Sequence, residues 1–130
     1  MAPTLGRMTL LVDDYEEALE YYTETMGFEV IADRELDDGF RALHVGSPDQ
    51  ESVGLWLVEA EGDAERELVG NQTGDYPSFV FYTDDVYRTY EELGDRGVEF
   101  TGEPQAGESG THVHFEDLYG NCGVFVELDE

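Results

Sequence analysis

The chain has 130 residues, which is enough for one ordinary domain with a shared core and too few for two independent domains. Its 32 Asp and Glu residues outnumber 6 basic residues, all of them Arg, so the formal net charge is −26. This balance disfavours nucleic acid and anionic membranes as partners, because both attract basic patches. The acidic residues are spread along the chain, which indicates a solvated surface adapted to a salt-rich cytoplasm.

Cysteine usage and the N-terminal pattern indicate the compartment. Cys122 is the only cysteine, which excludes an intrachain disulfide and a cysteine-based metal cluster. The N-terminus lacks the charged and then apolar pattern of a secretion signal, and the longest apolar runs have the length of a strand. We therefore expect a cytoplasmic protein that does not cross a membrane.

A repeated pattern divides the chain into two similar modules. Residues 12–14 (Val-Asp-Asp) are followed by a helical stretch and Gly27, and residues 83–85 (Thr-Asp-Asp) are followed by another helical stretch and Gly97. In each copy an Asp caps a helix, and a Gly ends the helix before the next strand. The pattern predicts an α+β fold of two tandem β-α-β-β-β modules within one domain.

The predicted elements of the first module (7–60) begin with a strand at 8–12. A helix follows Asp14, which forms a capping box with Glu17. Apolar alternation and turn residues then predict strands at 28–36, 40–45 and 53–58.

The second module (77–130) follows an acidic, Gly-rich linker at 61–76 and is predicted to repeat the same order. Its predicted elements are a strand at 78–83, a helix at 86–96, and strands at 98–101, 111–115 and 123–128. Residues 102–110, which are rich in Gly, are expected to form a mobile loop.

The segment 115–121 (Phe-Glu-Asp-Leu-Tyr-Gly-Asn) and the duplicated module together resemble the vicinal oxygen chelate superfamily. That superfamily contains glyoxalase I, extradiol dioxygenases, fosfomycin-resistance enzymes and bleomycin-binding proteins, and the resemblance covers nearly the whole chain. It implies an incompletely closed eight-stranded mixed sheet around a cavity, in a glyoxalase-like homodimer.

Metal-dependent members of that superfamily hold a divalent ion with His, Gln or Glu side chains on four strands. The matching positions of this chain hold Arg7, Trp56, Ser78 and Val124. Arg, Trp and Val side chains offer no usable metal donor, whereas a catalytic ion needs about three. Glu59 and Glu127 would serve only if their strands were shifted by one residue. The resemblance therefore predicts a site with no metal and no cofactor.

The three histidines and two of the arginines are the remaining candidates for a cavity. His112 and His114 are two residues apart on a predicted strand and so project from one face, and His44 is expected to join them. We interpret them as polar residues that line a pocket, with metal ligation as the alternative. Arg7 and Arg41 are candidates for holding an anionic group such as a carboxylate. The alternative is an internal ion pair, which is favoured more for Arg41 than for Arg7.

The predicted function is metal-free binding of a small organic molecule, anionic or aromatic, for sequestration or sensing. The candidate ligand-binding residues are Arg7, Arg41, His44, Trp56, Ser78, Tyr82, His112 and His114. One alternative is a metal-dependent lyase or dioxygenase, in which an ion stabilises an enolate. Another is a metal-free enzyme in which His112 or His114 acts as a general base. The fold alone does not decide between them.

We predict that the protein needs salt to remain folded, because its negative charges repel one another. Molar salt shortens the Debye length from about 10 Å to about 3 Å and removes most of this repulsion. Dialysis from molar to millimolar KCl should therefore cause cooperative unfolding or a large loss of melting temperature, measured by circular dichroism. Unchanged stability across that range would contradict the prediction.

Overall fold

A computed structural model describes residues 2–50, 53–108 and 110–128 of the chain. Backbone contacts divide it into two compact units, Met1–Val69 and Gly70–Glu130, and the boundary falls inside the predicted linker at 61–76. The strands form a mixed sheet of four in the first unit and a mixed sheet of five in the second. The predicted α+β fold class is therefore confirmed, with the strands divided between two sheets.

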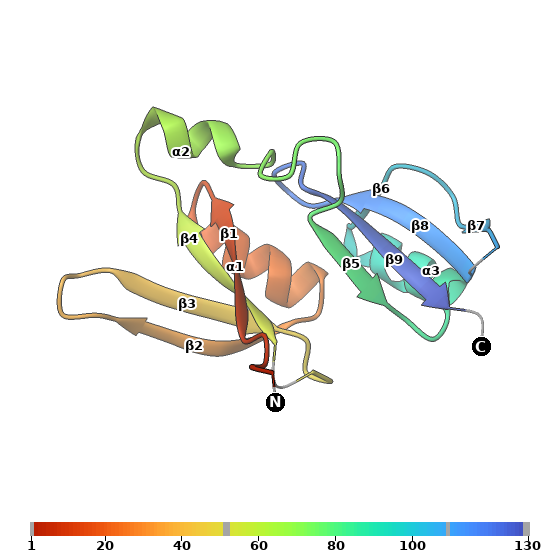
Figure 1. The fold of residues 1–130 in the computed structure, drawn as a ribbon, viewed down its shortest axis with the longest axis horizontal. Coiled ribbons are helices and arrows are strands. Elements are labelled where there is room, and N and C mark those ends of the chain that lie inside the picture. The colour runs from red at the N-terminus through yellow and green to blue at the C-terminus, as the bar shows by residue number, and fades with distance from the viewer. Residues whose placement is uncertain (1, 51–52, 109, 129–130) are drawn as a thin grey trace. The chain divides into compact units, whose positions relative to one another are not determined.

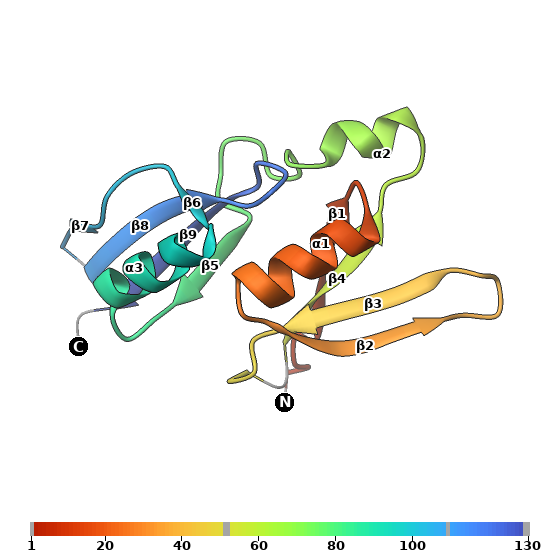
Figure 2. The same ribbon diagram turned by 180° about the vertical axis from the view of Figure 1, so that it is seen from behind.

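The first unit has the predicted β-α-β-β-β order (Figure 1). Its elements are β1 (Arg7–Val12), α1 (Tyr15–Glu20), the π-helical turn η1 (Tyr21–Thr25), β2 (Glu29–Glu35), β3 (Arg41–Gly46), β4 (Gly54–Glu59) and α2 (Gly62–Leu68). The sheet order is β1-β4-β3-β2, in which β1 runs parallel to β4 and the other neighbours are antiparallel. Helix α1 lies against one face of this sheet (Figure 2). We call the opposite face the open face of the first sheet.

The core of the first unit lies between α1 and its sheet. Side chains that the alternation of the strands turns toward α1 are buried: Leu10, Val12, Leu43, Val45 and Leu57. Ala18 and Tyr22 complete this core from the helical side. Each large apolar side chain buried here stabilises the fold by about 1.5–3 kcal/mol relative to exposure.

The second unit repeats this arrangement (Figure 1). Its elements are β5 (Phe79–Tyr82), α3 (Val86–Arg96), β6 (Glu99–Phe100), β7 (Gln105–Ala106), β8 (Gly110–Glu116) and β9 (Cys122–Leu128). The sheet order is β5-β9-β8-β6, β7 pairs with β8, and β5 runs parallel to β9 as β1 does to β4. Helix α3 lies against one face of this sheet (Figure 2), and we call the other face the open face of the second sheet.

With 11 residues α3 is the longest described helix, and none of the described helices is long and apolar enough to cross a bilayer.

The two main helices begin with equivalent hydrogen bonds, which confirms the predicted caps. The Asp14 carboxylate accepts from the amide of Glu17 at 3.0 Å, and the Asp85 carboxylate accepts from the amide of Arg88 at 3.1 Å. A glutamate from the last strand of each module adds a second bond. Glu59 accepts from the amide of Tyr15 at 3.1 Å, and Glu127 accepts from the amide of Val86 at 2.9 Å. These carboxylates also oppose the partial positive charge of each helix N-terminus.

Two short elements differ from the sequence expectation. Helix α2 lies inside the predicted linker, and all of its residues are exposed, so it has no buried stripe that a sequence pattern reveals. Strand β7 lies inside the loop expected at 102–110 and pairs with residues 111–112 of β8. Two residues are too few to show the alternation by which a strand is recognised.

The segment 115–121 forms a buried turn between β8 and β9. The Asp117 side chain is only 5% exposed, and its carboxylate accepts from the amides of Tyr119 and Asn121, both at 2.9 Å. It also accepts from the side-chain amide of Asn121 at 2.8 Å. Gly120 has a φ of +89°, which a residue with a side chain rarely adopts. The most specific stretch of the resemblance is thus a structural turn that joins the last two strands.

We predict that Asp117→Ala lowers the free energy of unfolding by about 3 kcal/mol, because it leaves buried amide donors without an acceptor. Denaturant titration in molar KCl measures this change. Asp75→Ala, an exposed carboxylate of the same unit, is the control and should change stability by no more than about 0.5 kcal/mol. Equal effects of the two substitutions would show that the buried carboxylate does not stabilise the turn.

Candidate functional site

Three of the candidate residues meet on the open face of the first sheet. In the β3–β4 pairing His44 lies opposite Trp56, and in the β1–β4 pairing Trp56 lies opposite Thr9. Arg7 is on the same face, at the start of β1. Arg7, His44 and Trp56 come from three different strands, so this cluster depends on the strand order and register of the whole sheet.

A hydrogen bond joins Arg7 to His44 and fixes the state of the imidazole. The Arg7 Nε–H donates to Nδ1 of His44 at 2.8 Å, and an Arg7 Nη1–H donates to the carbonyl of Gly6 at 2.7 Å. Because Nδ1 accepts a hydrogen bond, His44 is a neutral imidazole with its proton on Nε2. Burial lowers the pKa of His44 below 6.5, and the charges of Arg7 and Arg34 lower it further. His44 therefore presents one N–H donor.

Aromatic rings surround this polar pair. The Trp56 ring lies 5.8 Å from the His44 ring and 6.1 Å from the ring of Phe40, centroid to centroid. The Trp56 Nε1–H is buried and has no hydrogen-bond partner in the described part of the chain. A buried donor without an acceptor is unfavourable until an acceptor binds it.

Arg34 and Phe40 belong to this cluster and were not predicted from the sequence. Arg34 lies on β2 opposite Ala42, two residues along from the pair formed by Ala32 and His44, and is therefore on the open face. A bulge between Val30 and Ala32 shifts the pairing of β2, so only the register with β3 shows this placement. Phe40 stands just before β3, and the alternation of that strand is the one sequence signal for its orientation.

Arg41 does not join this cluster. Its guanidinium pairs with Asp33 at 2.8 Å and with Glu16, and it lies 5.3 Å from the centre of the Tyr15 ring. The bond from Arg41 lowers the pKa of the Asp33 carboxyl. The structure thus places Arg41 in the internal ion pair that the sequence analysis gave as the alternative. Exposed ion pairs of this kind contribute about 1 kcal/mol or less.

The candidate residues of the second module form a separate set on the open face of the second sheet. Tyr82 lies opposite Val126, and Val126 lies opposite His112, so one row of this face runs across three strands. The rings of His112 and His114 are 5.3 Å apart. Val113 is buried on the helix side, as expected if the two histidines project from the other face.

The hollows near this second set have polar and acidic linings. One of about 210 Å³ lies beside the two histidines and is lined by Thr101, Gly102, Glu103, Gln105, His112, Val113 and His114. Another of about 360 Å³ is lined by Tyr82, Thr83, Asp84, Glu127 and Leu128. Ser78 lies just before β5, and its hydroxyl is 3.0 Å from that of Thr73.

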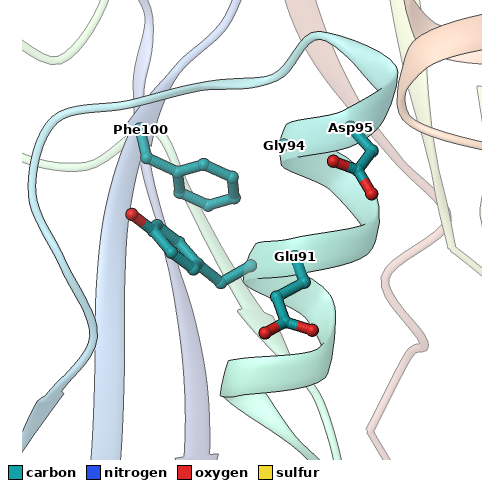
Figure 3. A pocket seen from close by; sticks show the side chains of 5 residues that line it. Glu91, Gly94, Asp95 and Phe100 are labelled. Carbon is teal, nitrogen blue, oxygen red and sulfur yellow. The ribbon is translucent and has the colours of Figure 1, made fainter.

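A further groove, of about 550 Å³, lies where α3 meets β6 (Figure 3). The rings of Tyr90 and Phe100 are 4.7 Å apart here, and Gly94 leaves space beside them. Glu91 and Asp95 extend from the same stretch of α3 (Figure 3). The groove contains none of the candidate residues, and its carboxylates would repel an anion.

Comparison with known proteins places this chain in a family. The model of the Glyoxalase/Bleomycin resistance protein/Dioxygenase superfamily matches residues 4–128. The chain belongs to this superfamily. It is 31% identical over 131 residues to an uncharacterized protein of Shewanella frigidimarina (strain NCIMB 400), covering 100% of this chain and 97% of that protein.

Two solved structures are similar to this chain along nearly their whole length. UcmS2 has a TM-score of 0.86 and 30% sequence identity, over 98% of this chain and 99% of that chain. TnmS3, an antibiotic binding protein from Streptomyces sp. CB03234, has a TM-score of 0.79 and 26% identity, over 98% of each chain. The match of the family model to residues 4–128 confirms the predicted membership of the superfamily.

The side chains at the superfamily's metal-ligand positions do not fit a divalent ion in this member. Arg7 and Trp56 occupy two of these positions on the open face of the first sheet. Glu59 and Glu127, the nearest carboxylates on the strands concerned, bind helix N-termini on the opposite faces. Within residues 2–50, 53–108 and 110–128, no group of three or more His, Cys, Asp or Glu side chains is arranged to hold a metal.

We predict that His44 titrates with a pKa below 6.5, and that Arg7→Ala or Arg34→Ala raises this pKa by removing a neighbouring positive charge. With three histidines in the chain, NMR titration resolves each one. In the unfolded chain His44 is protonated as the pH falls through about 6.5, whereas in the folded chain its protonation requires a lower pH. Its contribution to the stability of the fold is therefore lost as the pH falls below 6.5. Arg66→Ala, in α2, is the control and should leave the His44 pKa unchanged. An ordinary pKa for His44 that neither substitution moves would contradict the prediction.

Proposed function

We propose that this superfamily member binds a small organic molecule, aromatic or anionic, on the open face of the first sheet without a metal ion. The observation that carries the proposal is the cluster of Arg7, His44 and Trp56, in which ring surface and directed donors lie side by side. A flat ligand would stack on Trp56, meet the Phe40 ring edge to face, since the two rings are at 83° to each other, and accept hydrogen bonds from the polar groups beside them.

The similarity to TnmS3 supports binding as the function, because that relative is an antibiotic binding protein. The donor set supports a metal-free site, since a guanidinium and an indole stand where metal-dependent relatives have ligands. The biological outcome that we propose is sequestration or sensing of the bound molecule, by a salt-adapted homodimer in the cytoplasm.

The test uses phenylnaphthylamine, an uncharged aromatic probe whose emission rises when it leaves water. Trp56 is the only tryptophan in the chain, so energy transfer from tryptophan to the probe reports binding near this site. We expect saturable binding that survives dialysis against a chelator, and no stoichiometric Zn, Ni, Mn or Fe by elemental analysis. Trp56→Ala should weaken binding roughly tenfold, measured by the emission of the probe itself.

Tyr87→Ala, which removes an exposed ring from α3, is the matched control and should leave binding unchanged. Absence of saturable binding, or equal effects of the two substitutions, would contradict a ligand site at Trp56. Stoichiometric metal that disappears when His112 and His114 are replaced would instead support the metal-dependent lyase or dioxygenase.

A further inference from the structure

The arginines of this chain divide into two groups by their partners. Three of them form ion pairs with carboxylates, namely Arg41, Arg66 and Arg88. The other three, Arg7, Arg34 and Arg96, have no carboxylate partner among the residues that the structure describes. In a chain with 32 acidic and 6 basic residues, a nearby carboxylate is the usual neighbour of an arginine. Arg96 is exposed at the end of α3. Arg7 and Arg34 lie on the same sheet face, and the positive charge of each lowers the pKa of His44.

Three of the four acidic side chains on the strands of this sheet are turned away from these two arginines, and Glu29 is the one that lies on the open face. Asp33 and Glu35 lie on the helix side of β2, and Glu59 holds the N-terminus of α1. Glu29 pairs with Gly46 beyond the bulge, and no described ion pair joins it to Arg7 or Arg34. The positions around His44 therefore form a local positive surface in a protein of net charge −26.

The side chains of Arg7, Arg34, His44 and Trp56 present hydrogen-bond donors on this face. Arg7 keeps N–H groups beyond those used by His44 and Gly6, and Arg34 is exposed with N–H groups available to a ligand. His44 offers Nε2–H because its Nδ1 already accepts from Arg7, and Trp56 offers its buried Nε1–H. A ligand that satisfies this surface must supply acceptor atoms.

Without a ligand the charges of Arg7 and Arg34 have no counter-ion among the described residues. Two guanidinium groups act on the same imidazole, and no carboxylate compensates them. His44 accepts a bond from Arg7 without neutralising it, because a neutral imidazole carries no charge. A bound anion would supply this counter-charge and would make short, charge-assisted hydrogen bonds with a guanidinium.

We propose that the ligand of this site is a planar aromatic anion, whose acceptor oxygens bind Arg7 and Arg34 while its ring stacks on Trp56. This inference rests on the proposed function and adds the charge class of the ligand. His44 is a positioning residue in this scheme, since its Nδ1 holds the Arg7 guanidinium on the open face. The specificity comes from donors and positive charge together, so cationic and uncharged aromatics bind less well.

Three fluorescent aromatic probes test the charge class: anilinonaphthalene sulfonate, which is an anion, its uncharged parent phenylnaphthylamine, and the cation thioflavin T. Affinities are measured in molar KCl by energy transfer from Trp56. The sulfonate should bind roughly tenfold or more tightly than its parent, as one charge-assisted hydrogen bond contributes that much. Thioflavin T should bind most weakly. The net charge of the protein alone predicts the opposite order, because it repels anions and attracts cations.

Substitutions of single arginines test which side chains cause the preference for the anionic probe. Arg7→Ala and Arg34→Ala should each weaken the sulfonate roughly tenfold and leave phenylnaphthylamine nearly unchanged, whereas Arg66→Ala should change neither. His44→Asn should preserve more sulfonate affinity than His44→Leu, because an amide oxygen can still accept from Arg7. Circular dichroism checks that each variant folds. If Arg7→Ala does not fold, Arg34→Ala tests the anion class instead. Arg34 is exposed on the sheet surface, so its substitution should leave the fold intact.

The outcomes separate this inference from the proposed function. Equal binding of the sulfonate and its parent, with no effect of Arg7→Ala or Arg34→Ala on either, would overturn the anion class and leave an aromatic site in place. Tighter binding of thioflavin T would overturn it as well. Failure of both phenylnaphthylamine and the sulfonate to bind near Trp56 would overturn the proposed function and this inference with it, whereas sulfonate binding that needs both arginines, without binding of phenylnaphthylamine, would support the site and its anion class.

Discussion

The parallel pairing of the first and last strands in each module is the constraint on which the rest of the structure depends. A parallel pair cannot be closed by a tight turn, so the chain must cross over through α1 in the first unit and α3 in the second. The helix of this crossover covers one face of the sheet, and it leaves the opposite face uncovered. In the first unit this pairing also sets Trp56 beside β1, so that the face opposite α1 collects Arg7, His44 and Trp56 from separate strands.

The sequence predicts the features that local chemistry determines. Asp14 and Asp85 are recognisable caps because each is a short carboxylate just before an apolar helical stretch, where it accepts a hydrogen bond from an amide of the first turn. The seven strands longer than two residues and the two main helices follow from apolar spacing, and the duplicated pattern gives their order. Helix α2 was not predicted because an exposed, acidic helix has no apolar period.

Features that depend on register were less accessible from the sequence. His44 and Trp56 are far apart in sequence, and the sequence indicated that both would line a cavity without showing that they are opposite each other. Arg41 and Arg34 are similar as residues, yet one lies on the helix side with Asp33 and the other on the open face. The β2 bulge and the β2–β3 pairing decide that difference, and neither has a local sequence signature.

The glutamates at the ends of β4 and β9 have a consequence for how members of this fold diverge. Glu59 and Glu127 tie each helix to the last strand of its module from the helix side, where the buried apolar residues also lie. The contacts that hold each unit together are therefore concentrated on one side of each sheet. Side chains on the other side can be exchanged over evolution with little effect on folding, so that one scaffold acquires new ligands by changing a single surface.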